Sequence, residues 1–344
     1  MSGDPLAGTL DSLLEGATLT PVEATAAFEA IMDGHVPPAR LAAFLIALRL
    51  RGETVDEIAA FARVMRARVT PVRAAARDTI DTCGTGGDRS GTFNISTLAA
   101  IVAAAAGAPV AKHGNRSVSS RCGSADLLAG LGVDVQAPIS RVEQALAEIG
   151  IGFLYAPMLH GAMRHAAPVR RELGVRTVFN LLGPLTNPAG ARRQLLGVYD
   201  AAWVEPIARV LLELGSVRAM VVHGAGLDEI ALHGETRVAE VREGGIRVFL
   251  VSPADAGLET APLQTIAGGD VQANVAFALG VLRGDKGPRR DVVLLNAAAA
   301  IVIGDRAADL REGAALAARA IDSGAALQVL ERLKAICPVP GAGD

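Results

Sequence analysis

Aromatic residues and lysine are both scarce in this sequence. Phe, Tyr and Trp make up 3% of the 344 residues, whereas 51% are hydrophobic and 38 are glycine. A core with few rings has to be filled by small aliphatic side chains on closely packed elements. Only three of the 33 basic residues are lysine, namely Lys112, Lys286 and Lys334. Because arginine occupies every other basic position, we infer that lysine is kept where arginine cannot replace it.

The sequence also lacks a long hydrophobic run, a surplus of positive charge and a cysteine framework. The longest apolar run, residues 98–106, is too short to span a bilayer, and no signal peptide is visible. A net charge of -3 gives no electrostatic footprint for nucleic acid or an anionic membrane. Three cysteines without metal-ligand spacing suit a reducing compartment. We therefore expect a cytoplasmic enzyme or binding protein with no nucleic-acid and no membrane partner.

Helix signals fill the first part of the chain, where no strand signal is present. Residues 20–23 form a capping box with proline at the first helical position, and Gly34 ends that helix. A second helix is predicted over 38–52 and a third over 54–68. The sequence therefore predicts a helical domain of residues 1–72.

From residue 79 onward, short β runs alternate with helices. The predicted strands cover 79–83, 109–112, 152–155, 194–198 and 218–223, and the helices between them lie near 96–106, 124–131, 141–149 and 201–214. Such alternation favours right-handed crossovers and a mainly parallel sheet. Residues 237–241 and 246–251 predict a hairpin at the sheet edge, and the chain after residue 268 is predicted to be helical.

The fold class that follows is α/β, with a small all-helical domain joined to a large α/β domain that has a mainly parallel central sheet. The large domain is expected to cover residues 73–344. The stretch from about 170 to 190 interrupts the alternation with helix-like sequence. We expect this stretch to return to the helical domain.

A glycine-rich turn, residues 84–88, follows the first predicted strand. Its bare backbone N–H groups can approach an anion closely, and Asn94, Ser96 and Thr97 then begin a helix whose N-terminus favours phosphate. The turn is not a Walker motif, because no Lys-Ser or Lys-Thr pair follows it. On its own, such a turn is more often an ordinary strand-to-helix connection.

A polar loop of residues 112–120 directly follows the second predicted strand. It places two permanent cations, an imidazole, an amide and three hydroxyls within nine residues. That set of groups suits a polyanion with ribose-like hydroxyls. A polar surface loop is the alternative, but open α/β sheets bind ligands at the C-terminal ends of their strands, which favours function.

Two adjacent carboxylates, Asp228 and Glu229, stand behind a glycine-containing turn. Hard cations such as Mg²⁺ prefer oxygen ligands and normally accompany phosphate substrates. An isolated Asp-Glu pair is usually just solvated charge. The pair gains weight because it too follows a predicted strand.

A fourth stretch, residues 160–188, contains Arg170 on a segment bounded by proline and glycine. An arginine held in this way suits bidentate capture of a planar carboxylate. Arginines on a helix surface and a plain turn would explain the same residues.

The ordered set of motifs resembles the anthranilate phosphoribosyltransferase family. Its most specific marks are GTGGD (84–88), NIST (94–97), KHGNR (112–116) and LGPLTNPA (182–189), and the resemblance covers nearly the whole chain. It implies a homodimer with the active site between the two domains. It also implies transfer of the 5-phosphoribosyl group from phosphoribosyl pyrophosphate to the amine of anthranilate, the second step of tryptophan synthesis.

The resemblance also implies which residues bind the substrates and two Mg²⁺ per subunit. Expected at the donor are Gly84, Gly86, Gly87, Asp88, Thr92, Asn94, Ser96, Thr97, Lys112, Asn115, Arg116, Ser117, Ser119, Ser120 and Ser124. Expected at anthranilate are Gly84, Asn115, His160, Arg170 and Gly183, and at the metal Ser96, Asp228 and Glu229. Catalysis would be mainly electrostatic, with Lys112 neutralising pyrophosphate and His113 as the nearest candidate base.

Two other functions remain open at this point. A pyrimidine nucleoside phosphorylase of the same fold needs a phosphate loop, but it needs neither two Mg²⁺ nor an arginine that binds a carboxylate. A non-catalytic relative that binds nucleic acid would require a basic cleft, which the negative net charge does not favour. The metal set and Arg170 favour the transferase over both.

Overall fold

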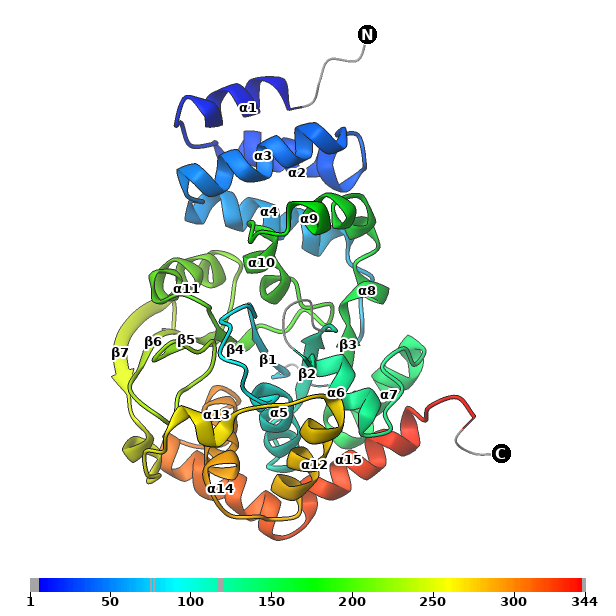
Figure 1. The fold of residues 1–344 in the computed structure, drawn as a ribbon, viewed down its shortest axis with the longest axis vertical. Coiled ribbons are helices and arrows are strands. Elements are labelled where there is room, and N and C mark those ends of the chain that lie inside the picture. Colours follow the sequence, from blue (N-terminus) through cyan, green and yellow to red (C-terminus); the bar gives the residue numbers. More distant parts are fainter. Residues whose placement is uncertain (1–5, 75, 77, 117–120, 342–344) are drawn as a thin grey trace.

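A bundle of helices stands on a larger body built around one seven-stranded sheet (Figure 1). The computed structural model describes residues 6–74, 76, 78–116 and 121–341. The bundle comprises α1 (Ala7–Leu14), α2 (Pro21–Met32), α3 (Pro38–Arg51) and α4 (Val55–Arg68). Thr20 and Thr54 cap α2 and α4 with complete capping boxes, in agreement with the sequence signals.

Helix α1 was not predicted individually from the sequence. It has no side-chain cap and no acidic residue in its first turn, so the usual start signals are missing. Leu6, Leu10 and Leu13 are instead buried against the bundle, and α1 packs on α3. Burial of one apolar face therefore stabilises this helix where local signals do not.

The sheet has the order β3-β2-β1-β4-β5-β6-β7. Its strands are β1 (Ile80–Gly84), β2 (Val110–Gly114), β3 (Ile151–Tyr155), β4 (Arg193–Gly197), β5 (Arg218–Gly224), β6 (Thr236–Arg242) and β7 (Gly245–Val251). The first five in this order are parallel, and β6 and β7 are added antiparallel. The predicted mainly parallel sheet with an edge hairpin is thus confirmed.

Helices cover both faces of the sheet (Figure 1). One core is formed with α5 (Ile95–Ala105), α6 (Ser124–Gly130), α7 (Ile139–Ile149), α12 (Val271–Leu282), α13 (Pro288–Ile303), α14 (Leu310–Asp322) and α15 (Ala325–Ile336). The other face lies under α11 (Val204–Glu213), whose core is continuous with that of the helical bundle. No helix in the described part of the chain is both long and apolar enough to cross a membrane.

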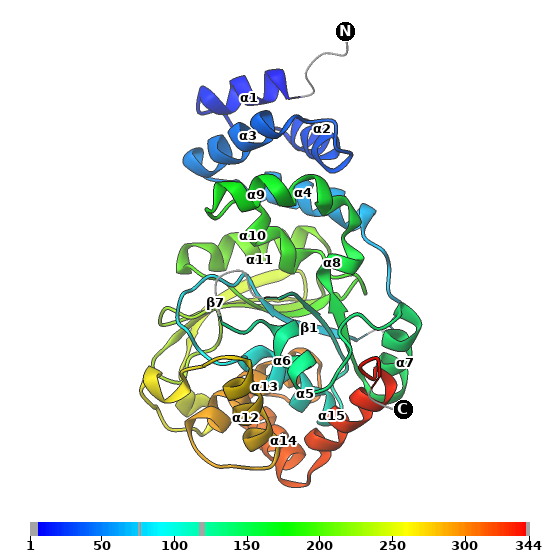
Figure 2. The same cartoon turned by 45° about the vertical axis from the view of Figure 1, so that its right-hand side comes forward.

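The segment between β3 and β4 runs along the helical bundle. It contains α8 (Ala156–Leu159), α9 (Ala167–Leu173) and α10 (Phe179–Leu182), and α9 packs on α3 while α10 packs on α4. Figure 2 shows α9 beside α4, above α10 and α11. The Phe28 ring stacks on Phe61 at 4.6 Å and meets Phe179 of α10 at 5.3 Å between ring centroids. Short 3-10 helices complete the chain at Gly161–His165, Gly183–Leu185, Ala201–Trp203, Pro253–Ala256 and Leu263–Ile266.

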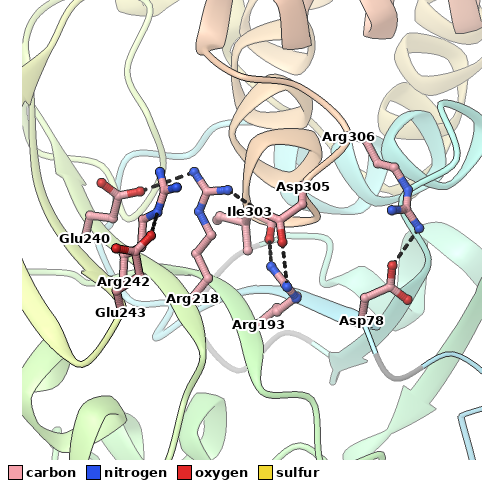
Figure 3. Close-up of polar contacts among 9 residues, drawn as sticks. All are labelled: Asp78, Arg193, Arg218, Glu240, Arg242, Glu243, Ile303, Asp305 and Arg306. Carbon is pink, nitrogen blue, oxygen red and sulfur yellow. Dashed lines mark hydrogen bonds and ion pairs between the residues drawn. The ribbon is translucent and has the colours of Figure 1, made fainter.

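A row of ion pairs ties α13 to the N-terminal ends of the central strands (Figure 3). Asp305, just after α13, accepts from Arg193 at 2.6 Å and from Arg218 at 2.5 Å. Arg193 also donates to the Ile303 carbonyl at 2.6 Å, and cations are favourable at such a helix C-terminus. This row lies at the N-terminal ends of the strands, opposite the end where open α/β sheets bind ligands.

Candidate active site

Strands β1 and β4 end in glycines that allow another chain segment to lie directly on them. A Cβ added to Gly84 would come within 2.3 Å of the Asp228 Oδ2 atom, and one added to Gly197 within 1.6 Å of the Asp228 carbonyl oxygen. Any side chain there would displace the loop that carries Asp228 and Glu229. The two carboxylates therefore lie over the C-terminal ends of these strands, which is the end where open α/β sheets bind ligands.

The two carboxylates meet the glycine-rich turn and the start of α5. Asp228 Oδ2 accepts the Gly86 N–H at 2.7 Å, and Glu229 Oε1 accepts the Ser96 N–H at 3.1 Å. The Lys112 ammonium, only 3% exposed, donates to Ser96 Oγ at 3.2 Å and to the Thr82 carbonyl. Four separate parts of the chain thus converge on one polar cluster.

Negative charge is poorly compensated in this cluster. Burial raises the pKa of Glu229 to about 7, although Lys112 opposes the change. Burial also raises the pKa of Asp228 well above its usual value, and the charges of Asp88 and Glu229 add to the shift. Strongly shifted pKa values of neighbouring carboxylates mark a candidate functional site, and a bound cation would favour the ionised form of both.

The cluster is not a complete protein cage for a metal. Among the described residues, no group of three or more His, Cys, Asp or Glu side chains is arranged to hold a metal ion. Mg²⁺ typically binds one or two carboxylates and takes its other ligands from water and substrate phosphates. The donor set of Ser96, Asp228 and Glu229 fits that mode of binding.

The N-terminus of α5 offers polar atoms to a ligand. Asn94 stands at the N-cap, yet its side chain makes no capping bond and donates instead to the Cys122 carbonyl at 2.9 Å. Its Oδ1 atom and the Thr97 hydroxyl are buried and have no hydrogen-bond partner among the described residues. Buried polar atoms are normally paired. At a helix N-terminus, the Thr97 hydroxyl suits a phosphate oxygen as its acceptor, and Asn94 Oδ1 suits a ribose hydroxyl as its donor.

A pair of buried histidines lies behind the cluster. The Nε2 atoms of His113 and His160 are 3.0 Å apart, and His113 also has a hydrogen bond with the Gly183 backbone. Burial lowers the pKa of His113 to about 3 and that of His160 to about 4, so both rings are neutral at pH 7. The His113 ring is a weak base, because its pKa is low and it already has hydrogen-bond partners in His160 and the Gly183 backbone. The geometry favours shaping a pocket over proton abstraction for His113.

Other predicted residues lie around this centre without contacting it. The Arg170 guanidinium stacks 5.0 Å from the centre of the Phe179 ring, and burial lowers its pKa. Asn115 and Arg116 are exposed at the end of β2, where the Asn115 carbonyl accepts from Ser124 Oγ at 3.2 Å.

The rest of the glycine-rich stretch is held both by its own residues and by distant parts of the chain. Thr92 Oγ1 lies 3.3 Å from Ser90 Oγ, Asp88 accepts the Ser90 N–H at 3.1 Å, and the Gly87 carbonyl accepts from Arg176. Ser117, Ser119 and Ser120 lie outside the described residues.

Several residues in or behind the site were missed by the sequence analysis. Asp81 is fully buried in β1 and accepts the His113 N–H at 3.1 Å, and burial raises its pKa. Gln194 donates to the Pro184 carbonyl at 2.6 Å. Asn296 binds the chain beside Glu229. Polar residues inside otherwise apolar strand and helix patterns were the available signal.

Comparison with known proteins gives one consistent family. Residues 8–69 match the glycosyl transferase family, helical bundle domain, and residues 76–327 match its a/b domain. An anthranilate phosphoribosyltransferase of Rhodospirillum rubrum is 53% identical over 99% of this chain and 98% of its own length. One from Anaeromyxobacter dehalogenans is 56% identical over 95% of this chain and 97% of its own length.

Solved structures agree with the sequence relatives. The anthranilate phosphoribosyltransferase of Thermus thermophilus is 50% identical, with a TM-score of 0.91 over 95% of this chain and 98% of its own. That of Saccharomyces cerevisiae in complex with PRPP and Mg is 29% identical, with a TM-score of 0.89 over 98% of both chains. The same yeast protein has been solved with 4-fluoroanthranilate, at a TM-score of 0.86 over 96% of this chain and 97% of its own.

Proposed function

The chain belongs to the anthranilate phosphoribosyltransferase family, and from that premise we propose how its own residues perform the transfer. The reaction moves the 5-phosphoribosyl group from phosphoribosyl pyrophosphate to the amine of anthranilate, and it releases pyrophosphate. The observation that carries the assignment of roles is the cluster of Lys112, Ser96 and Glu229 at the N-terminus of α5. It gathers a cation, a hydroxyl and a carboxylate where phosphate binding is favoured.

The donor would occupy the space above α5 and the glycine-rich turn. Asn94 Oδ1 would accept from a ribose hydroxyl, Thr97 Oγ1 would donate to a phosphate oxygen, and Lys112 would neutralise the pyrophosphate. Ser96, Asp228 and Glu229 would hold Mg²⁺, which supplies positive charge against the leaving pyrophosphate. We propose two Mg²⁺ per subunit.

Anthranilate would enter between the helical bundle and the sheet. Neutral His113 and His160, together with Gly183, form one wall of its channel. Arg170 faces the carboxylate, and its guanidinium, already partly desolvated on Phe179, is suited to a bidentate pair. Asn115 and Gly84 complete the acceptor site.

In the transfer, the amine nitrogen forms a bond to C1 of the ribose as the bond from C1 to the pyrophosphate oxygen breaks. The electron pair of that bond leaves with pyrophosphate, and the amine gives up one proton to solvent. An aromatic amine is a weak nucleophile, so departure of pyrophosphate leads and C1 becomes positively charged. Lys112 and the backbone N–H groups of the glycine-rich turn stabilise the leaving group, while the channel holds the amine in line.

We also propose a cytoplasmic homodimer, divided into a helical domain of residues 1–72 and an α/β domain of residues 73–344. Among the described residues, the three most exposed large hydrophobic side chains are Leu14, Val22 and Leu50, which are 71%, 78% and 82% exposed. All three lie on the helical bundle. We propose that the interface lies on this domain and covers these side chains.

The activity is tested by mixing the protein with anthranilate and phosphoribosyl pyrophosphate, with and without Mg²⁺. Loss of anthranilate fluorescence and release of pyrophosphate are followed together. Mg²⁺-dependent loss with equal pyrophosphate is the expected result. Pyrophosphate release with another aromatic acceptor would keep the donor site and overturn the role of Arg170. A protein that cleaves a pyrimidine nucleoside with phosphate, and never turns over the donor, would be a phosphorylase instead.

A further inference from the structure

Asn296 is a fully buried polar side chain in the middle of α13, and it binds the backbone next to the two carboxylates. Its Oδ1 atom accepts the Ile230 N–H at 2.9 Å, and its Nδ2 atom donates to the Ile230 carbonyl at 2.9 Å. The second Nδ2 proton goes to the Val292 carbonyl, also at 2.9 Å. Both donors and the acceptor of the amide are thus used, and both polar groups of Ile230 depend on it.

Helix propensity does not explain why an asparagine stands in the middle of α13. Asparagine is a poor residue for a helix interior, and α13 is otherwise buried around it by apolar side chains. Loss of the amide would leave two backbone groups of Ile230, itself 1% exposed, without partners. A buried backbone group left without a partner is costly, because it has lost its bonds to water as well. The amide therefore serves the loop through two hydrogen bonds and its own helix through one.

The same loop is held from its other side. Thr236 Oγ1 accepts the Ala231 N–H at 2.9 Å, and Thr236 is fully buried. A Cβ on Gly224 would come within 2.4 Å of the Glu229 carbonyl, so the loop also rests on the end of β5. Residues 228–231 are therefore fixed through their backbone, while the side chains of Asp228 and Glu229 are left to face Gly86 and Ser96.

We propose that Asn296, with Thr236, is a positioning residue for the divalent-cation site. This inference rests on the proposed function, in which Asp228 and Glu229 hold Mg²⁺. Two neighbouring carboxylates repel each other, and a loose loop would turn them apart into solvent. The hydrogen bonds of Asn296 and Thr236 hold the two carboxylates side by side before the cation arrives. Cation binding therefore does not have to offset the entropy cost of ordering the loop.

The test is calorimetric titration of phosphoribosyl pyrophosphate into the full-length protein at a series of Mg²⁺ concentrations. Its readout is the Mg²⁺ concentration that half-restores donor affinity, which needs no turnover. Asn296→Ala is expected to raise that midpoint roughly 10- to 100-fold, the usual effect of removing a group that orients metal ligands. Thr236→Val, which keeps the shape of the side chain, is expected to move the midpoint in the same direction.

The chain offers a matched control in Asn274 of α12. It is 3% exposed, and its amide binds the N–H and carbonyl of Gly269 in the same two-bond pattern, each at 3.2 Å. Its loop carries neither of the proposed carboxylate ligands. Asn274→Ala should lose comparable stability in urea and leave the Mg²⁺ midpoint within about twofold of the parent protein.

The other outcomes distinguish the positioning role of Asn296 from the assignment of Asp228 and Glu229 as metal ligands. A midpoint unchanged in Asn296→Ala but raised in Glu229→Gln would overturn the positioning role and leave the metal ligands in place. An unchanged midpoint in Glu229→Gln as well would overturn the metal assignment itself. If Asn296→Ala does not fold, Thr236→Val decides the question, and a parent-like midpoint there would reject the inference.

Discussion

The three lysines differ sharply in their surroundings. Lys112 is 3% exposed and wedged between the Thr82 carbonyl and Ser96, whereas the side chains of Lys286 and Lys334 are 73% and 35% exposed in surface ion pairs. The inference that lysine is kept where arginine cannot serve is therefore supported at Lys112 alone. We infer that this buried position suits a compact ammonium better than a larger, planar guanidinium.

The Lys112→Arg variant should consequently lose activity, although the substitution preserves the charge. We expect kcat/KM for phosphoribosyl pyrophosphate to fall at least about 100-fold, a typical loss for one electrostatic group in an active site. Lys334→Arg is the control and should keep parent activity. Steady-state assays of the two variants decide the matter, and a fully active Lys112→Arg protein would show that only charge is needed there.

The histidine pair gives a pH prediction. The folded protein holds His160 neutral with a pKa of about 4, whereas an unfolded chain has a histidine pKa near 6.5. The folded pKa is the lower one, so stability that is present above pH 6.5 is lost as the pH falls toward 4. The slope is up to about 1.4 kcal/mol per pH unit.

The measurement is the free energy of unfolding of the parent protein relative to His160→Asn, by urea titration between pH 4.5 and 7.5. The comparison removes the opposite contribution of Glu229, whose raised pKa is present in both proteins. The parent protein should lose stability relative to the variant as the pH is lowered. A difference that stays constant with pH would mean that His160 is not held neutral.

At the scale of elements, α13 is anchored at two places, once to the loop of the candidate site and once to the sheet. In its middle, Asn296 binds the loop of the candidate site. Just past its C-terminal end, Asp305 binds Arg193 and Arg218 on adjacent strands (Figure 3). Burial raises the pKa of Asp305, but the bonds from the two arginines outweigh this and leave the pKa below its usual value.

Asp305→Asn keeps a residue that tolerates the positive φ of 56° and removes only the charge. We expect a loss of roughly 1 to 3 kcal/mol, because the buried Arg218 loses a charged partner. Glu331→Gln, in the exposed pair with Lys334, should cost less than about 0.5 kcal/mol. Urea unfolding compares the two. Equal costs would show that the row at the sheet edge is no stronger than a surface pair.

At the scale of the whole molecule, the helical bundle and the sheet meet through one continuous core and a few polar contacts. Arg49 of α3 donates to the Arg176 carbonyl, and Arg176 in turn donates to the Gly87 carbonyl and stacks 4.3 Å from the Tyr199 ring. The glycine-rich turn is thereby linked to the helical bundle. A donor bound at this turn would contact a segment whose position depends on both parts of the molecule.

The proposed homodimer makes a prediction at this scale. The protein should sediment at about twice its chain mass of 35.2 kDa, and Leu50→Glu should shift it toward the single-chain mass by placing a charge in a buried interface. Leu250→Glu on edge strand β7, where Leu250 is 60% exposed, is the control and should sediment like the parent. A parent protein that sediments as a single chain at micromolar concentration would reject the homodimer.

The sequence by itself determined the order of the elements after α1 and the chemistry available to them. Periodicity, capping boxes at Thr20 and Thr54, and glycine turns act over a few residues, so helices and strands could be predicted from local patterns. Parallel strands place their C-terminal ends together. That rule led us to expect the glycine-rich turn, the loop after the second strand and Asp228 at the same end of the sheet.

Only the tertiary structure decided which of these groups touch. The bond from Asn296 to Ile230 spans 66 residues and the pairing of His113 with His160 spans 47, and neither leaves a local pattern. Arg170 was predicted from its flanking residues, yet its stacking on Phe179 comes from the packing of α9 and α10. Such contacts depend on how helices settle on the sheet, which is a property of the whole core and not of any one segment.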